Sequence, residues 1–156
     1  MDALAIFGLQ LILSLVVWGL IGKWLLAPWL EKKSLHQSLF WLTLPHASRH
    51  IGMVFLGPGI AAQPLPDSFA IPAAYGDLIS ALLALAALIA LRTGRTGALV
   101  LVWIFNIVGT VDLMYALSHA DAVPGLGAAW YIPTFWVPLL LVTHFMIFVR
   151  LIRRES

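Results

Sequence analysis

The sequence predicts an all-α fold, a polytopic transmembrane helix bundle of five spans with its N-terminus outside and its C-terminus in the cytoplasm. Two observations favour this fold: the composition of the chain and the placement of its charges. Hydrophobic residues make up 62% of the 156 residues and charged residues only 10%, whereas about a quarter of the residues in a soluble domain are charged. We therefore expect residues 1–156 to form a single integral membrane domain.

Five stretches of the chain approach the roughly 20 mostly apolar residues that one crossing requires. The second stretch is the least apolar, because Pro45, His46, Arg49 and His50 interrupt it. An arginine in mid-span costs about 2.5 to 3.5 kcal/mol on the insertion scale. The expected spans cover about residues 3–26, 39–56, 71–91, 98–118 and 131–149.

The basic residues support five crossings. With five, eight of the nine Lys and Arg residues lie on one side of the membrane and none on the other, which is the positive-inside pattern. If the second stretch did not cross, Arg92 and Arg95 would lie opposite Lys32 and Lys33. The basic side carries Lys23, Lys32, Lys33, Arg92, Arg95, Arg150, Arg153 and Arg154, and the other side carries Asp2, Asp67 and Asp121.

Several functional classes are disfavoured by the sequence. The net charge of +2 comes from residues between apolar runs, so we expect the lipid bilayer and not nucleic acid as the partner. The absence of cysteine excludes disulfides, thiolate metal sites and a Cys nucleophile. No Ser-His-Asp spacing or phosphate-binding glycine loop is present, and enzymatic activity is not the favoured interpretation.

Ionisable residues inside the expected spans are the candidates for function. Counting about 1.5 Å per residue from the span ends places Asp77 and Asp112 roughly 9 Å deep, with Arg49 and His50 at similar depth. Isolated charges at that depth are costly, so these groups should face the bundle interior and pair. Asn106 lies on the same helix side as Asp112. We predict that these residues bind or relay a proton, a cation or a small polar ligand.

The histidines allow a second kind of site. His46 and His50 are four residues apart, a spacing that points two imidazoles the same way in an α-helix and recurs in metal sites. With Asp77, Asp112 or His144 as a third ligand they would form a transition-metal site, and a haem between His46 and His144 is a further option. Hydrogen-bonded structural histidines are the favoured alternative, so the cofactor is left unknown.

Four segments carry a resemblance: PHASRHIGMVF (45–55), FAIPAAYGDL (69–78), FNIVGTVDL (105–113) and YIPTFWVPLLLVTHFMIF (131–148). Together they resemble a group of small, uncharacterised bacterial multi-pass inner-membrane proteins. The resemblance implies a bacterial inner membrane and no particular activity. It assigns no role to any residue.

Three functional hypotheses remain open. The first is the binding or relay site described above, which a cavity reaching the outer face would favour. The second is an accessory or scaffolding subunit, in a homo-oligomer or a larger membrane complex, in which the charges form an enclosed interhelical lock. The third is a membrane-embedded redox protein that binds a metal or haem.

Overall fold

The chain is helical throughout its regular elements in a computed structural model that describes residues 2–62 and 64–153. Arg154, one of the basic residues counted above, lies outside the described residues. Within the described residues, four helices are long and apolar enough to cross a membrane: Ala3–Glu31, Asp67–Thr93, Ala98–Leu117 and Gly127–Arg153. The prediction of an all-α fold with membrane-length helices is confirmed.

The first long helix consists of α1 (Ala3–Ile21), a π-helical turn η1 (Gly22–Leu26) and α2 (Ala27–Glu31). The Asp2 carboxylate caps it by accepting a hydrogen bond from Ala5 N at 2.7 Å. The next helix begins with a capping box, in which Ser34 and Gln37 each bond the other's backbone amide. The helix that follows the reversal thus has its own polar start signal.

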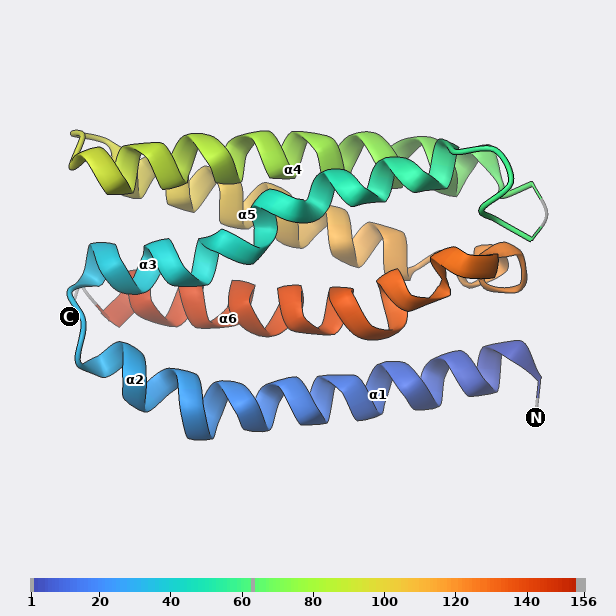
Figure 1. Cartoon of the computed structure of the whole chain (residues 1–156), viewed down its shortest axis with the longest axis horizontal. Coiled ribbons are helices and arrows are strands. Elements are labelled where there is room, and N and C mark those ends of the chain that lie inside the picture. Colours follow the sequence, from blue (N-terminus) through green and yellow to red (C-terminus); the bar gives the residue numbers. More distant parts are fainter. Residues whose placement is uncertain (1, 63, 154–156) are drawn as a thin grey trace.

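The second segment changes helix type along its length. It begins as α3 (Leu35–Thr43) and continues as a 3₁₀-helix, η2 (Leu44–Leu56). Pro45 stands at the change because it has no amide hydrogen to donate to an α-helical acceptor. Figure 1 shows α3 and η2 running together along the bundle beside the longer helices. The stretch expected at 39–56 therefore exists, but it starts earlier and is not one regular α-helix.

The third and fourth helices, α4 (Asp67–Thr93) and α5 (Ala98–Leu117), pack along each other and are joined by a tight turn. Gly94 and Gly97 occupy left-handed positions there, with φ of 64° and 93°. Pro72 lies inside α4 and cannot donate to Ser68 O, but Tyr115 Oη donates to that carbonyl at 3.2 Å. The neighbouring helix thus satisfies the group that the proline frees.

The last part of the chain is the most irregular. After α5 come two 3₁₀ turns, η3 (Ala120–Gly125) and η4 (Gly127–Trp130), and a π-helical turn η5 (Ile132–Trp136) that leads into α6 (Val137–Arg153). Two backbone hydrogen bonds join this region to the connection between η2 and α4. Ala62 N donates to Gly125 O at 3.2 Å, and Ala128 N donates to Ile60 O at 3.1 Å.

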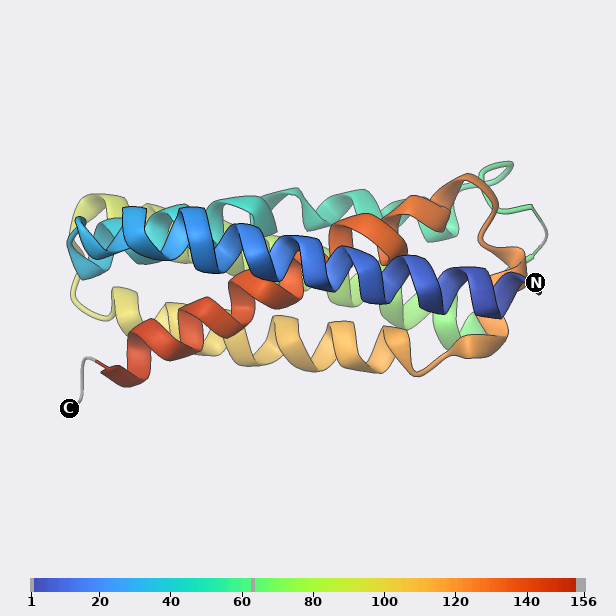
Figure 2. The ribbon, with the colours of Figure 1, turned by 90° about the horizontal axis from the view of Figure 1, so that it is seen from below.

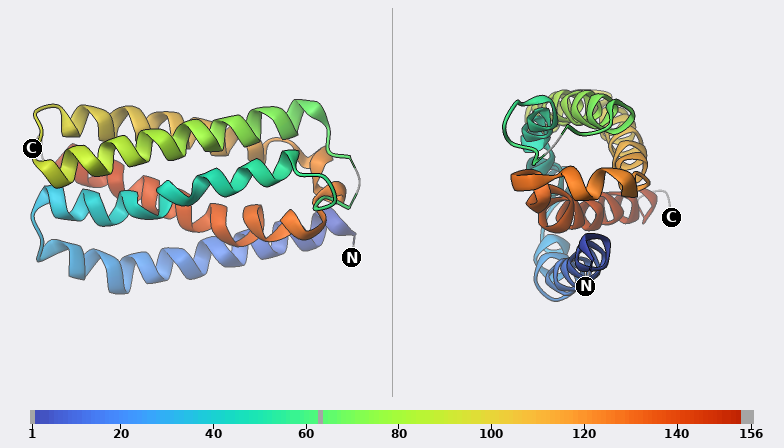
Figure 3. Two further views of the ribbon diagram at one scale, coloured as in Figure 1. Left: turned by 45° about the horizontal axis from the view of Figure 1, so that its top comes forward. Right: turned by 90° about the vertical axis from the view of Figure 1, so that its right-hand side faces the viewer.

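Four helical segments surround the centre of the molecule and the first helix lies outside them. The end-on view in Figure 3 shows α3–η2, α4, α5 and α6 around the centre, with α1 beside α6. Most α1 side chains face outward, and Phe7 is its one buried residue. The N-terminus and the connections at 57–66 and 118–131 share one end of the bundle, which we call the N-terminal end (Figure 1). The other end, with the turns at 32–34 and 94–97, we call the basic end.

Candidate functional site

Arg49 occupies the centre of a buried polar cluster. Because a 3₁₀-helix repeats every three residues, η2 turns His46, Arg49, Gly52 and Phe55 inward. The Arg49 side chain, with the residue 1% exposed, contacts two acidic residues from two other helices. Its Nε donates to Asp77 Oδ1 at 2.7 Å, and its Nη2 forms a short ion pair with Asp112 Oδ2.

Glycines make room for both carboxylates. A Cβ on Gly52 of η2 would overlap the Asp77 carboxylate, and a Cβ on Gly76 of α4 would overlap the Asp112 carboxylate. Each aspartate therefore lies directly against the backbone of a neighbouring helix. Small residues allow such close approach between helices in lipid.

The guanidinium also bonds a helix backbone. Arg49 Nη1 donates to Gly109 O at 3.0 Å, and a Cβ on Gly109 would stand 2.7 Å from Nη1 and 2.8 Å from His144 Cε1. Such distances leave no space for a side chain at this position. Arg49 thus joins η2 to α4 through Asp77 and to α5 through both Asp112 and the Gly109 carbonyl.

His144 and Asn106 extend the cluster toward the basic end. Arg49 Nη1 lies 3.5 Å from His144 Nε2, and His144 Nδ1 lies 2.6 Å from Asn106 Oδ1. Because a guanidinium only donates hydrogen bonds, Nε2 is the acceptor and Nδ1 carries the hydrogen. Asn106 Nδ2 in turn donates to His144 O at 3.2 Å. This pattern describes a neutral imidazole that orients one edge of the guanidinium.

His46 packs on His144 with an unusual set of partners. The two ring centroids are 4.1 Å apart. Thr143 donates its hydroxyl hydrogen to the backbone, so its Oγ1 accepts from His46 Nε2 at 2.9 Å. His46 Nδ1 has no hydrogen-bond partner among the described residues, and neither do the buried hydroxyls of Thr43 and Ser80.

A cavity of about 120 Å³ leads to the two aspartates from the N-terminal end. Asp77 and Asp112 are lining residues and keep 11% and 12% of their side chains exposed, whereas Arg49 keeps none. The walls are mainly apolar, and His119 is a further ionisable lining residue. Representative wall residues are Phe7, Phe55, Phe69, Leu113, Leu126 and Val137.

Toward the basic end the polar cluster meets an apolar core. Phe105 packs edge-on against the His46 ring, with centroids 4.9 Å apart. Phe105 belongs to a hydrophobic cluster to which α3, α4, α5 and α6 all contribute buried side chains. Its members include Leu39, Leu42, Val102, Phe105, Ile147 and Leu151. The acidic cavity therefore lies on the N-terminal side of the Arg49 cluster, and the apolar core lies on the other side.

The structure corrects the placement of His50. This residue is exposed, and its Nδ1 contacts the backbone carbonyl of Ala47 at 3.0 Å instead of the cluster. In an α-helix, residues four apart point about 40° from each other, but in a 3₁₀-helix they point about 120° apart. His46 faces inward, so His50 faces outward, and the expectation that both histidines share a site is wrong.

The same geometry separates the proposed metal ligands. His46 and His144 lie together, but His50 does not join them, and no group of three or more His, Asp or Glu side chains among the described residues could hold a metal ion. The contacting His46 and His144 rings leave no gap for a haem, and each already has a ring nitrogen engaged by Thr143 or Asn106. These residues do not fit either cofactor.

The remaining expected site residues are brought together. Arg49, Asp77, Asp112 and Asn106 form one connected set with His144, which the sequence suggested only as a metal ligand. Sequence reasoning did not single out Thr143 as a partner of His46. The sequence feature that could have identified Thr143 is its position next to His144 in an otherwise apolar span.

Comparison with curated proteins and with solved structures finds no match. A family model, in contrast, matches residues 6–152, a range that reaches into every helical segment and contains every residue of the polar cluster. The chain belongs to the family described as "Domain of unknown function (DUF8737)".

Proposed function

We propose that the chain is a bacterial inner-membrane protein that crosses the bilayer five times, with its N-terminus outside. The side-by-side course of α3–η2 and the four longer helices supports five crossings (Figure 1). Asp67 begins α4 and Asp121 lies in η3, both at the N-terminal end, whereas Arg92 is in the last turn of α4 and Arg95 is in the turn at the other end. The positive-inside rule then assigns the basic end to the cytoplasm.

We further propose that the Asp77–Asp112 cavity binds a proton or a small organic cation from the outer side. The observation that carries this is the charge of the cluster: one guanidinium contacts two carboxylates, so a negative charge is left over when both are ionised. His144 does not balance it, because it accepts a hydrogen bond from Arg49. An uncompensated charge at this depth is costly, so a proton or cation completes the site.

The part of each carboxylate that lines the cavity is where such a group would bind. Arg49 engages Asp77 Oδ1 and Asp112 Oδ2, and the other two oxygens pack against the backbones of Gly52 and Gly76. A cation would therefore reach the carboxylates from the cavity, where 11% of the Asp77 side chain and 12% of the Asp112 side chain stay exposed. The cavity of about 120 Å³ has room for a short alkylammonium ion, since a water molecule takes about 30 Å³ of liquid. Its apolar walls suit the alkyl part. Because the apolar core closes the other side, binding is favoured over passage through the protein.

Calorimetric titration of the protein in lipid nanodiscs with ethylammonium chloride tests this proposal. Wild-type protein should bind one ethylammonium ion, and Asp112→Asn should bind it about tenfold more weakly or worse, because a charge-assisted hydrogen bond is lost. Asp121→Asn is the matched control, since Asp121 is an exposed acid in the same outer region. No binding by wild-type protein, or equal loss in both variants, would contradict the proposal.

A second function is favoured by a different observation. Arg49 is enclosed and bonded to α4 and α5 at once, as expected for an interhelical lock in an accessory or scaffolding subunit. Purification from the native membrane in a mild detergent separates the two. Recovery with a partner chain in fixed stoichiometry, and no cation binding, would favour the subunit.

A further inference from the structure

A second recess lies between the first and last helices and shares no lining residue with the acidic cavity. It has a volume of about 600 Å³ and is lined by α1, η1 and α2 on one side and α6 on the other. Figure 2 shows α1 passing across α6, so the two helices diverge toward their ends at the basic end. The middle of the recess is apolar, with Leu15, Val142, Phe145 and Met146 in its walls.

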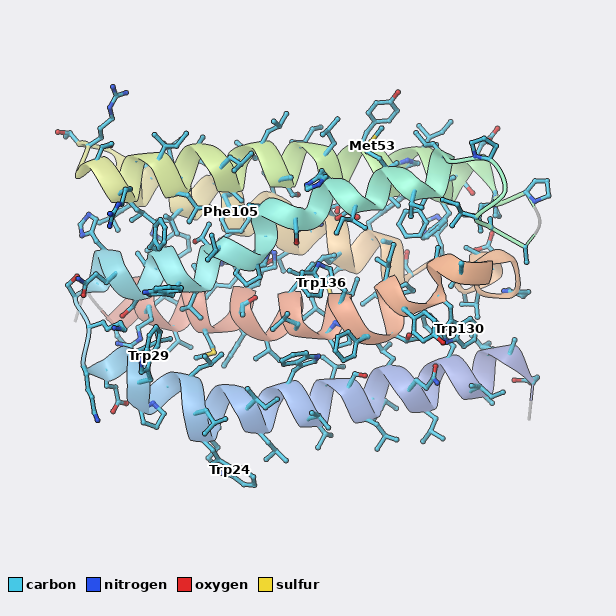
Figure 4. The ribbon with its side chains drawn as sticks, viewed as in Figure 1. Trp24, Trp29, Met53, Phe105, Trp130 and Trp136 are labelled. Carbon is cyan, nitrogen blue, oxygen red and sulfur yellow. The ribbon has the colours of Figure 1, made fainter. Side chains whose placement is uncertain are left out.

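The two helices are fixed to each other at defined points. Toward the N-terminal end, Trp130 Nε1 donates to Gln10 Oε1 at 2.6 Å, and Trp130 is seen beside α1 in Figure 4. Trp18 Nε1 donates to Phe135 O at 3.1 Å. Further along, Gly22 lies so close to α6 that a Cβ there would stand 3.1 Å from Val142 Cγ1. These contacts fix the position of the first helix relative to the last, and so they fix the two walls of the recess.

Charge is concentrated where the recess reaches the basic end. Lys23, Arg150 and Arg153 line it there together with one acid, Glu31, so the lining carries an excess of positive charge. Arg150 Nη2 lies 3.5 Å from Ala27 O, which places its guanidinium across the end of the recess. The lining thus changes from apolar to cationic toward the basic end of the bundle.

We propose that this recess binds an anionic phospholipid of the bilayer. Its phosphate would lie against Lys23 and Arg150, and one acyl chain would lie in the apolar part beside Gly19. A phospholipid has an apolar acyl part and a charged headgroup, and these match the apolar and the cationic parts of the lining. Basic pockets between transmembrane helices bind anionic headgroups. A zwitterionic lipid supplies the acyl chain but no net charge to match. This inference does not depend on the acidic cavity.

The headgroup contact is tested by native mass spectrometry of protein released from nanodiscs that contain phosphatidylglycerol and phosphatidylcholine. We expect preferential retention of phosphatidylglycerol, reduced about fivefold by either Lys23→Gln or Arg150→Gln. Arg92→Gln, an exposed charge at the same end of the bundle but outside this lining, should leave retention unchanged. Equal retention of the two lipids by wild-type protein would overturn the proposal.

The acyl-chain contact is tested by filling the recess from α1. A Cβ on either Gly8 or Gly19 meets nothing within 4 Å, but only Gly19 lines the recess. Gly19→Leu should displace the bound phosphatidylglycerol, whereas Gly8→Leu should retain it at the wild-type level. Retention in both variants would show that the lipid binds only through surface charge and would overturn the recess as its site.

Discussion

Arg49 is the residue on which the centre of the bundle depends. Its guanidinium donates to two carboxylates and to the Gly109 carbonyl, so it neutralises charge and satisfies a buried helix backbone at the same time. The energetic consequence is asymmetric. Removing one member of a buried ionic group leaves the others uncompensated, whereas removing all the charges together leaves none.

Replacement of Arg49 tests that asymmetry. Arg49→Met should lower the free energy of unfolding by about 3 to 5 kcal/mol, because two carboxylates then face each other without a cation. The triple variant Arg49→Met, Asp77→Asn, Asp112→Asn should recover most of this loss. Chemical unfolding in detergent micelles, followed by circular dichroism, measures both. A triple variant no more stable than the single one would contradict the pairing.

Asp112→Asn alone should behave differently. An amide keeps an oxygen that accepts from Arg49 Nη2 and resembles the protonated carboxyl, so stability should stay within about 1 kcal/mol of wild type. Cation binding should nevertheless be lost. The same unfolding assay gives the stability, and a loss as large as that of Arg49→Met would show that Asp112 is needed as a charge by the fold itself.

Gly109 is a position where a single methyl group should matter. Gly109→Ala places a Cβ 2.7 Å from Arg49 Nη1, whose position three hydrogen-bonding groups fix, and we expect a loss of about 1 to 3 kcal/mol from overpacking. Gly8→Ala on α1 is the matched control and should be neutral or stabilising by up to about 1 kcal/mol, since alanine favours helix and the site is open. Equal unfolding midpoints for the two variants would contradict the packing.

The sequence was most informative about individual charges. A buried arginine and two aspartates at similar depth had to pair, because lipid offers no other partner, and Arg49, Asp77 and Asp112 do meet. The contributions of Gly52 and Gly76 were not predictable, because the sequence does not distinguish a glycine that faces lipid from one that faces a carboxylate.

At the scale of elements, η2 decides which side chains enter the site. Its 13 residues make an unusually long 3₁₀-helix. The sequence indicated a helix but not its period, and Pro45 indicated a break in the α-helix but not the helix type beyond it. The phase of a helix is set by packing, so the outward turn of His50 could not be read from the spacing of histidines alone.

Spin labelling tests the helix type directly, and the absence of native cysteine makes single-cysteine variants simple to prepare. Leu44 and Met53 are both exposed and nine residues apart, which is three turns of a 3₁₀-helix but about two and a half turns of an α-helix. Labels at both positions should therefore show equal accessibility to oxygen dissolved in lipid. A buried label at one position and an exposed label at the other would indicate an α-helix.

At the scale of the whole molecule, composition and charge placement were sufficient to predict an all-helical bundle with membrane-length helices, and α1 illustrates why. Its outward side chains are almost all apolar, and Trp24 of the adjoining η1 projects away from the bundle (Figure 4). A large exposed apolar surface marks a contact with lipid or with another protein. The sequence did not reveal that α1 lies outside the other four segments, because its apolar residues surround the helix on all sides.

Cysteine labelling in intact cells tests the orientation. A cysteine at Ala61 should react with a membrane-impermeant maleimide from outside, and a cysteine at Thr96 should react only after the membrane is opened, because these positions lie in connections at opposite ends of the bundle. Reaction of Thr96→Cys in intact cells, with Ala61→Cys protected, would reverse the proposed topology.

The Arg49 cluster, in our proposal, carries one negative charge that an exchangeable proton or cation neutralises. This charge is tested most directly by counting protons released when ethylammonium chloride is added to the protein in weakly buffered, sodium-free solution across a range of pH. We predict release of up to one proton for each ethylammonium bound by wild-type protein, and none from Asp112→Asn. Binding without proton release at every pH, or equal release from the variant, would contradict the proposed charge.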